Sequence, residues 1–339
     1  MEEENSKYEP SRRSTLEKFT EVIKQLEAGK YTTNKICLET GYLDEEDAAD
    51  RIGDEGAILL CKALKKNSHV KELELINQNI TAVGAKAIAE IDNLEEVNLY
   101  LNGIGANGAV ALVRGKFKVL NIEGTQIASE DEEGFITNHE EISILIRAII
   151  ENKTIKELNL SGNYIPDEYI AQLIAGNNTI EKLELYFTYL SDEALKYIDQ
   201  NNSLLYLNLS QGYNGNNISD EGAKYISKNN SLKVLIMDNS RITDTGAQIL
   251  SIHPTLKELS VRDSKITAEG LKYFLRSQLD NRSQLDKISV KNDEVRLDAL
   301  REFYSLFERA KNLRIEEQQD YNDEDSHEIP LSGDDYHID

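Results

Sequence analysis

The side chains in this 339-residue sequence best suited to covalent chemistry are its two cysteines, Cys37 and Cys61. Cys37 lies in the stretch NKICLET, where alternating apolar and polar residues place it on the outward side of a strand, near Lys35. A reactive thiolate needs a nearby cation and access to solvent. Cys61 lies in AILLCKAL, where we expect it to pack against apolar neighbours. One hypothesis is therefore an enzyme, or an adaptor in a ubiquitin pathway, that uses Cys37.

The remainder of the sequence shows no familiar catalytic or metal-binding pattern. It contains no Gly-rich phosphate loop, no nucleophile elbow and no His-Glu metal helix, and its five histidines lack ligand spacing. The sequence places no His or acidic partner for Cys37 either. We therefore expect a protein that is not an enzyme and that uses no cofactor and no metal.

Composition and charge restrict the partners and the compartment. The net charge is -23, and residues 316–339 hold ten Asp or Glu and no Lys or Arg, so setting these aside leaves -13. Nucleic acid and anionic membranes require a basic surface, whereas a basic protein would be attracted. No apolar run approaches the roughly 20 residues of a membrane span, and the acidic start MEEENSKYEPSRRS lacks the features of a signal peptide. Two cysteines make no disulfide framework, which favours a reducing cytoplasm.

The main regularity is a repeat with the pattern L-x-x-L-x-L-x-x-N-x-I-x-x-x-G-A-x-x-L and a period near 24 residues. Its first half alternates apolar and polar residues, as in Leu73 and Leu75, which predicts a strand with one buried side. Its second half, from Gly222 through Ala223 to Ile226, has helical spacing. An irregular first unit starts near Thr33. The later units begin at Val70, Leu94, Phe117, Ile155, Ile180, Leu204, Leu232, Leu256 and Leu285.

A unit of one strand and one helix cannot bury its own apolar face, whereas stacked neighbours can. The pattern resembles the leucine-rich repeat, in its ribonuclease-inhibitor-like form. That resemblance implies an α/β solenoid shaped like a horseshoe, with a parallel sheet on the concave face and helices on the convex face. We predict about ten units over residues 33–296. Some bacterial proteins with these repeats are ubiquitin ligases, but no stretch here is long enough for their catalytic domain.

The ends of such an array expose apolar edges that need caps. Residues 1–32 are predicted to form an N-terminal helical cap, with Ser14 and Glu17 as a capping box. Its apolar stripe comprises Leu16, Phe19, Val22, Ile23 and Leu26. Residues 297–315 are predicted to form a C-terminal capping helix. Insertions at 39–50, 129–135, 210–217 and 276–284 are expected to form loops, and Thr137 and Glu140 predict a capping box after the second.

The repeat identifies which side chains face the concave surface. Most are small or charged, but several large apolar or aromatic side chains depart from this, and exposed aromatics on a rigid sheet are typical of binding hot spots. Tyr100–Leu101 and Tyr186–Phe187 occupy equivalent places three repeats apart, with Glu123 between them. The predicted protein-binding residues are Ile76, Tyr100, Leu101, Glu123, Tyr186, Phe187, Tyr206 and Ile236. An ordinary polar face with stray aromatics is the alternative.

Charge also divides this face into two halves. The acidic half is predicted to contain Glu72, Glu74, Glu96, Glu123, Glu157 and Glu184. The basic half is predicted to contain Lys233, Lys257, Arg262, Lys287 and Lys291.

The acidic residues 316–339 have few apolar side chains, so the sequence predicts a disordered tail. Its segment EEQQDYNDED resembles the acidic block in signals of Dot/Icm-type IV secretion used by intracellular bacteria. This resemblance implies an effector that is translocated into the host cytosol and binds a host protein on its concave face. A solubilising tail is the alternative. A eukaryotic cytosolic scaffold or inhibitor remains open as the other binding hypothesis, and we expect a monomer in either case.

Overall fold

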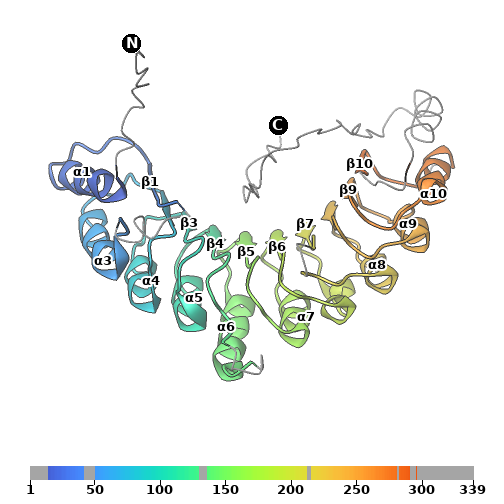
Figure 1. Ribbon diagram of the computed structural model, residues 1–339, viewed down its shortest axis with the longest axis horizontal. Helices are drawn as coiled ribbons and strands as arrows, with labels where there is room; N and C mark the ends of the chain where they lie inside the picture. Colours follow the sequence, from blue (N-terminus) through green and yellow to red (C-terminus); the bar gives the residue numbers. More distant parts are fainter. Residues whose placement is uncertain are drawn as a thin grey trace, which may run out of the picture.

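The computed structural model describes residues 14–41, 50–129, 136–211, 215–280, 282–290 and 295. In this part of the chain, ten parallel strands form one sheet and follow one another in chain order. The strands are β1 (Lys35–Glu39), β2 (Glu72–Ile76), β3 (Glu96–Asn98), β4 (Val119–Asn121), β5 (Glu157–Asn159), β6 (Lys182–Glu184), β7 (Tyr206–Asn208), β8 (Val234–Ile236), β9 (Glu258–Ser260) and β10 (Lys287–Ser289). The sheet is open and curved, with its strands lining the inner side of an arc (Figure 1).

Helices form the outer layer of the arc (Figure 1). They are α1 (Thr15–Glu27), α3 (Gly53–Leu64), α4 (Ala82–Ala89), α5 (Gly105–Val113), α6 (His139–Glu151), α7 (Asp167–Gly176), α8 (Asp220–Ile226), α9 (Asp244–Leu250) and α10 (Ala268–Leu279). Two short 3-10 helices, η1 (Asp192–Leu195) and η2 (Ile198–Gln200), replace the α-helix between β6 and β7. The predicted fold class, an α/β leucine-rich-repeat solenoid, is confirmed.

The core lies between the two layers. In each strand the pattern leucines point to the helices, and Leu73, Leu75, Val97 and Leu99 are at most 1% exposed. The intervening side chains, such as Glu72 and Glu74, lie on the opposite face, as the period-two pattern predicts. Each repeat therefore contributes one layer of core and one row of side chains to the concave surface.

Adjacent helices are joined through aspartates at or near the helix starts. The carboxylate of Asp220 in α8 accepts hydrogen bonds from the next repeat, from Thr243 N at 2.8 Å, Thr243 Oγ1 at 2.6 Å and Gly246 N at 3.0 Å. The same Asp-to-Ser or Asp-to-Thr contact recurs between Asp54 and Thr81, Asp167 and Ser191, Asp192 and Ser219, and Asp244 and Thr267. Each aspartate thus stabilises the N-cap of the following repeat.

This contact also explains the recurring glycine. A Cβ on Gly84 would lie 2.6 Å from Asp54 Oδ1 and 2.7 Å from Ile80 Cγ2. Any side chain at this position would clash with the carboxylate from the preceding helix and with the isoleucine of its own repeat.

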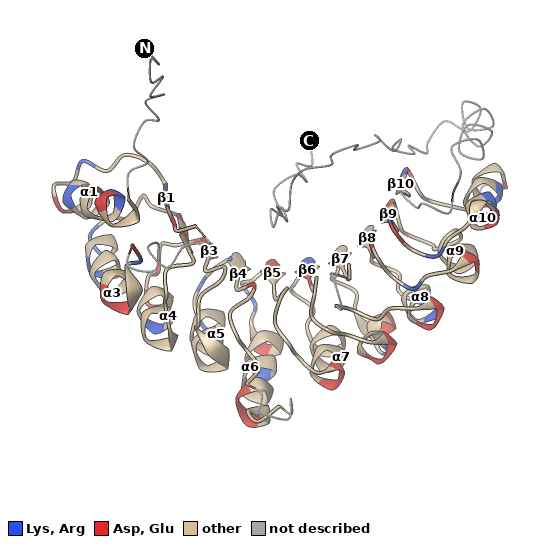
Figure 2. Cartoon of the chain, viewed as in Figure 1, with Lys and Arg blue, Asp and Glu red and all other residues tan. Residues whose placement is uncertain are grey.

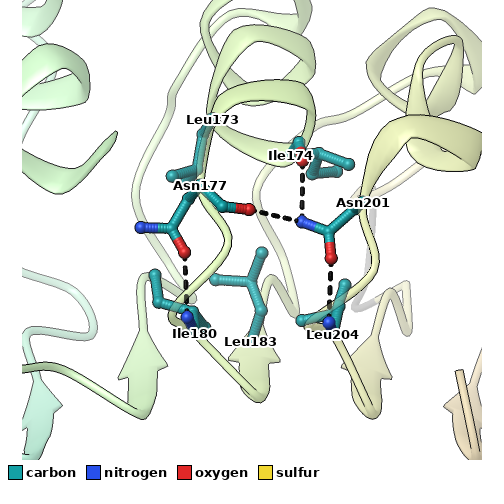
Figure 3. Close-up of a pocket in the computed structure, with 7 residues that line it drawn as sticks. All are labelled: Leu173, Ile174, Asn177, Ile180, Leu183, Asn201 and Leu204. Atoms are coloured by element: carbon teal, nitrogen blue, oxygen red, sulfur yellow. Dashed lines mark hydrogen bonds between the residues drawn. The ribbon is translucent and has the colours of Figure 1, made fainter. Parts of the chain in front are cut away.

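A second set of inter-repeat contacts lies at the turns that enter the strands. Asn201 Nδ2 donates to Ile174 O at 2.7 Å and Asn177 O at 2.8 Å, while its Oδ1 accepts from Leu204 N at 2.8 Å. Figure 3 shows Asn177 and Asn201 around a small gap in the core, also lined by Leu173, Ile174, Ile180, Leu183 and Leu204. Its volume suffices for about one water molecule, so we assign it to packing and not to a ligand.

His253 takes the place of asparagine in one of these turns. Its Nε2 lies 3.1 Å from Ile226 O, and its Nδ1 accepts from Leu256 N at 3.2 Å. These contacts fit a neutral ring that donates from Nε2.

The N-terminal helix has the predicted capping box. Ser14 Oγ accepts from Glu17 N, and Glu17 reaches back to Ser14 N. Leu26 is buried, and Phe19, Val22 and Ile23 pack against the core, but Leu16 is 39% exposed, so its place in the apolar stripe was wrong. The reason is that α1 begins at Thr15, whose buried hydroxyl, not Leu16, faces the first repeat.

The other predicted capping box was wrong. Helix α6 begins at His139 with Asn138 as its N-cap, and Thr137 Oγ1 instead donates to Ser129 O. The predicted C-terminal capping helix at 297–315 and the acidic tail at 316–339 lie outside the described residues. The same holds for residues 42–49, 130–135 and 212–214 of the first three insertions.

A candidate protein-binding site on the concave face

The repeat assigns each side chain on this face a place, counted from the first leucine of the pattern. Positions 3, 5 and 7 lie on the concave side, and position 8 begins the turn that leaves the strand. Tyr100 and Leu101 hold positions 7 and 8 beside β3, and Tyr186 and Phe187 hold the same positions beside β6. Strands β4 and β5 separate the two pairs, so they lie about 14 Å apart at roughly 4.8 Å per strand. We call them the flanking pairs.

Position 8 requires an unusual backbone conformation. In seven repeats of the described chain its φ is positive: Asn77, Leu101, Gly124, Gly162, Phe187, Asn239 and Asp263. Glycine, asparagine and aspartate tolerate this left-handed region, whereas a large side chain there costs about 1–2 kcal/mol. Leu101, at 56°, and Phe187, at 52°, are therefore the two residues at this position that do not suit its backbone.

Between the flanking pairs lies a strip of smaller residues, which we call the central strip: Glu123, Gly124, Ser161 and Gly162. Backbone hydrogen bonds continue the sheet through it, from Leu101 N to Glu123 O at 3.0 Å, Gly124 N to Ser161 O at 2.9 Å and Gly162 N to Tyr186 O at 2.9 Å. The flanking pairs and the central strip therefore form one continuous and rigid surface.

The aromatic surface extends beyond the predicted residues. Phe187 contacts Tyr186 and Tyr189, with ring centroids 6.2 Å and 5.2 Å apart, and Tyr189 meets Tyr164 edge-on at 5.4 Å. Tyr164 and Tyr189 are 38% and 50% exposed. Sequence reasoning missed both, although a signal existed, since position 10 is a tyrosine here and is Asn79, Gly103, Gln126, Arg241 or Lys265 in five other repeats.

Glu123 is the charged residue of the central strip. Its Oε2 accepts a hydrogen bond from Asn159 Nδ2 at 2.9 Å. Burial raises the pKa of Glu123, the Asn159 hydrogen bond opposes this, and the negative charge of Glu184 raises it further. Within the described residues no Lys or Arg forms an ion pair with Glu123.

The predicted acidic half of the face is present in the structure. Glu72, Glu96 and Glu157 share position 3, and all six predicted glutamates lie at positions 3, 5 or 7. Burial and the like charges of Glu72 and Glu157 raise the pKa of Glu96. Figure 2 shows the acidic segments near β1, and acidic residues also mark the outer helices.

The basic half is less distinct than predicted. Lys233 and Lys257 occupy position 2, before the strands, where their carbonyl oxygens accept hydrogen bonds from the next repeat. Arg262 is at position 7 and Lys287 at position 3, but Glu258 and Asp238 lie among them. The C-terminal half of the concave face therefore carries mixed charge, since Lys233 and Lys257 precede their strands and acidic residues lie among the basic ones. Lys291 lies outside the described residues.

Two of the predicted residues do not join the flanking pairs, and a third extends one of them. Ile236 is only 5% exposed, in register between Asn208 and Ser260 of the adjacent strands, so its prediction as an exposed contact was wrong. Tyr206 is at position 3, about 13 Å along the strand from position 7, with Lys182 Nζ 5.0 Å from its ring centroid. Ile76 is at position 7 of β2, next to Tyr100, and extends that pair.

The surroundings of Cys37 do not favour a thiolate. Cys37 lies on the exposed side of β1, but burial of the thiol and a hydrogen bond with Glu74 raise its pKa to about 11. Lys35, expected to activate it, instead forms an ion pair with Glu74 at 2.8 Å. The thiol is therefore protonated at neutral pH, the opposite of what a nucleophile requires. Cys61 is buried, as predicted.

A match to a known family model supports the repeat assignment. A family model described as Leucine Rich repeat matches residues 92–113, 151–168, 200–227, 228–251 and 253–275, which contain β3, β5, β7, β8 and β9. Among solved structures, internalin C2 of Listeria monocytogenes is 18% identical, with a TM-score of 0.40 over 67% of this chain and 84% of that chain. No curated protein matches the chain. Repeats of this kind form extended concave surfaces that bind other proteins.

The described residues contain no group of three or more His, Cys, Asp or Glu that could hold a metal ion. In the same part of the chain, no helix has the length and apolar character needed to cross a membrane.

Proposed function

We propose that this leucine-rich-repeat protein is a non-enzymatic binding module whose protein partner docks on the concave face across β3 to β6. The observation that carries the proposal is the placement of Leu101 and Phe187 at left-handed φ, where other repeats have glycine, asparagine or aspartate. Strained residues of this kind persist where they serve a function, and here both present an apolar side chain to the same surface.

The aromatic content supports the same surface. Tyr164, Tyr186, Phe187 and Tyr189 form a contiguous cluster on rigid sheet and turns. Such side chains provide large contact area at low cost in conformational entropy, and binding hot spots are enriched in them. The separation of about 14 Å between the flanking pairs fits within one protein interface, which typically buries about 800 Å² per partner.

The test is a double substitution, Tyr186→Ala with Phe187→Ala. A partner is first isolated with the wild-type protein from host-cell lysate and identified by mass spectrometry. The double variant should bind it at least about thirtyfold more weakly, because hot-spot truncation costs about 2 kcal/mol or more. Tyr197→Ala, at a 42%-exposed tyrosine between η1 and η2 on the helical side, is the matched control and should bind normally.

The melting temperature separates binding from packing. Because Tyr186 and Phe187 lie outside the core, the double variant should melt close to the wild type. Retained affinity with a lowered melting temperature would show that the aromatic cluster is structural and would refute the proposed site. Loss of an activity after alkylation of Cys37, with the double variant at Tyr186 and Phe187 still active, would instead support the enzyme or adaptor hypothesis.

We further infer that the module is a bacterial effector acting in a host cytosol. The support is the acidic block at residues 316–325, EEQQDYNDED. Fusing a translocation reporter to the protein and deleting residues 316–339 tests this inference. Translocation should be lost while the protein still accumulates in the bacterium and still binds its partner. Normal delivery of the truncated protein would contradict the inference and leave the binding proposal intact.

A further inference from the structure

The carboxylate of Glu123 is set apart on the concave face because it is well buried and also has no cationic partner among the described residues. Three other glutamates on this face form ion pairs, with Lys35 Nζ 2.8 Å from Glu74 and Lys182 Nζ 3.5 Å from Glu184 and 3.8 Å from Glu157. Glu96 forms no ion pair with a described residue either, but it is less buried than Glu123. Within the described residues, Glu123 has one side-chain hydrogen bond, from Asn159, which leaves its Oε1 and further lone pairs available.

Burial makes this arrangement unfavourable in the unbound protein. Removal of water from the carboxylate raises the pKa of Glu123, and Glu184 adds like-charge repulsion. A single amide hydrogen bond compensates for only part of the lost hydration of a carboxylate. A cation supplied from outside would compensate for more of it.

The residues on either side of Glu123 indicate which kind of cation fits there. Leu101 and Tyr100 lean toward Gly124, and Tyr186 and Phe187 lie beyond Gly162. The apolar stem of lysine or arginine packs along apolar and aromatic side chains while its charged end reaches a polar group. A metal ion or a free ammonium ion has no such stem, so a basic side chain of a protein fits this surface best.

We propose that the partner places one lysine or arginine side chain over the central strip, with its charged end at Glu123 and its stem against the flanking pairs. This inference rests on the proposed function and specifies the chemistry of the partner at the same site. The row of Glu72, Glu96 and Glu157 at position 3 supports it, because it makes this half of the face attractive to basic segments.

The experiment uses a library of short random peptides displayed on phage, selected on the full-length protein. We expect the recovered sequences to share a Lys or Arg next to apolar residues. One selected peptide is synthesised with its basic residue and with methionine in its place, which keeps a similar unbranched apolar stem. Calorimetry then measures both peptides against the wild type and against Glu123→Gln, which forms a double-mutant cycle.

The expected result is coupling between the two substitutions. Replacing the basic residue should weaken binding to the wild type about tenfold or more, as hydrogen bonds to charged groups contribute about 1.5–3 kcal/mol. The same replacement should change binding to Glu123→Gln much less. Glu168→Gln, on an exposed glutamate of α7, is the control and should give the wild-type difference.

The remaining outcomes separate the inference from the function on which it rests. Peptides that lose binding with the Tyr186→Ala and Phe187→Ala double variant, but are indifferent to Glu123→Gln, overturn the basic-residue inference and leave the concave site standing. Peptides that are indifferent to both variants, or the absence of any selected peptide, overturn both.

Discussion

Leu101 lies so close to Gly124 that its Cδ2 would be 2.8 Å from a Cβ at that position. The two residues hold position 8 in adjacent repeats, and both have positive φ, 56° and 61°. The glycine in one repeat is therefore what allows the large side chain in the preceding repeat.

Gly124→Ala should disturb this arrangement. The added methyl group must displace Leu101, and alanine at left-handed φ costs about 1 kcal/mol or more, so we expect lower stability by about 1–2 kcal/mol. Partner affinity should also fall because a flanking pair moves. Gly103→Ala is the control, since its Cβ would meet only Gln126 Oε1 at 3.7 Å. Equal melting temperatures and affinities for the two variants would contradict the account.

Phe187→Asn should separate stability from binding. Asparagine already occupies position 8 at Asn77 and Asn239 and tolerates left-handed φ, so relief of strain should offset the lost contacts with Tyr186 and Tyr189. We expect a free energy of unfolding within about 1 kcal/mol of the wild type and an affinity at least about tenfold weaker. Denaturant titration and calorimetry measure the two quantities. A strong loss of stability would show that Phe187 is held by packing instead.

His253 should make stability depend on pH. Burial, together with the charge of Lys233, lowers the pKa of His253 from its ordinary value of 6.5, while the hydrogen bond with Ile226 O opposes this shift. The unfolded chain therefore protonates His253 more readily than the folded chain does. The contribution of neutral His253 to the free energy of unfolding is full above pH 6.5 and is lost as pH falls from 6.5 toward the folded-state pKa. In His253→Asn, the new asparagine can form the same kind of turn hydrogen bonds that Asn201 and Asn229 form in other repeats, and it does not titrate. Melting curves at several pH values should lose the corresponding slope in this variant, and an unchanged slope would contradict the assignment.

Asp220→Ala removes the acceptor for three hydrogen bonds from the next repeat. Leaving part-buried donors without an acceptor costs about 1–3 kcal/mol, so the melting temperature should fall measurably. Glu221→Ala, at the neighbouring exposed residue with its ion pair to Lys224, should have a small effect. If both substitutions lower stability equally, the aspartate acts only through the helix terminus and not between repeats.

The sequence was sufficient to predict the strands, the concave face and the places of Tyr100 and Tyr186, because a period of two fixes which side chains share a face. Leu101 and Phe187 follow them at the start of the turn, which the same repeat pattern locates. It could not predict the burial of Ile236, which depends on the side chains of two adjacent strands. It also placed Lys233 and Lys257 on the concave face, although position 2 precedes the strand. The charge of a side chain can be read from the sequence, but the face of the sheet on which that side chain lies cannot always be.

The aspartate contacts were missed for a different reason. Asp220 follows Ser219 directly, and both residue types are common at the start of a helix, so nothing in the local sequence suggests a further role for Asp220. Its hydrogen bonds reach Thr243 and Gly246, more than 20 residues away, and only the stacking of repeats brings these together. The tyrosines at positions 164 and 189 were missed because the period-two pattern ends with the strand, and position 10 lies in the turn beyond it.

The hydrogen bonds that these aspartates form between repeats all run in the same direction along the chain. Each such unit offers a carboxylate to the unit after it, and a hydroxyl and a glycine amide to the unit before it, so both complementary parts are encoded within about 24 residues. A tandem duplication of one unit would therefore fit its neighbours on either side at once. Recombination within the gene can lengthen or shorten an array of this design, and so widen or narrow the surface that meets a partner, without a new interface having to evolve.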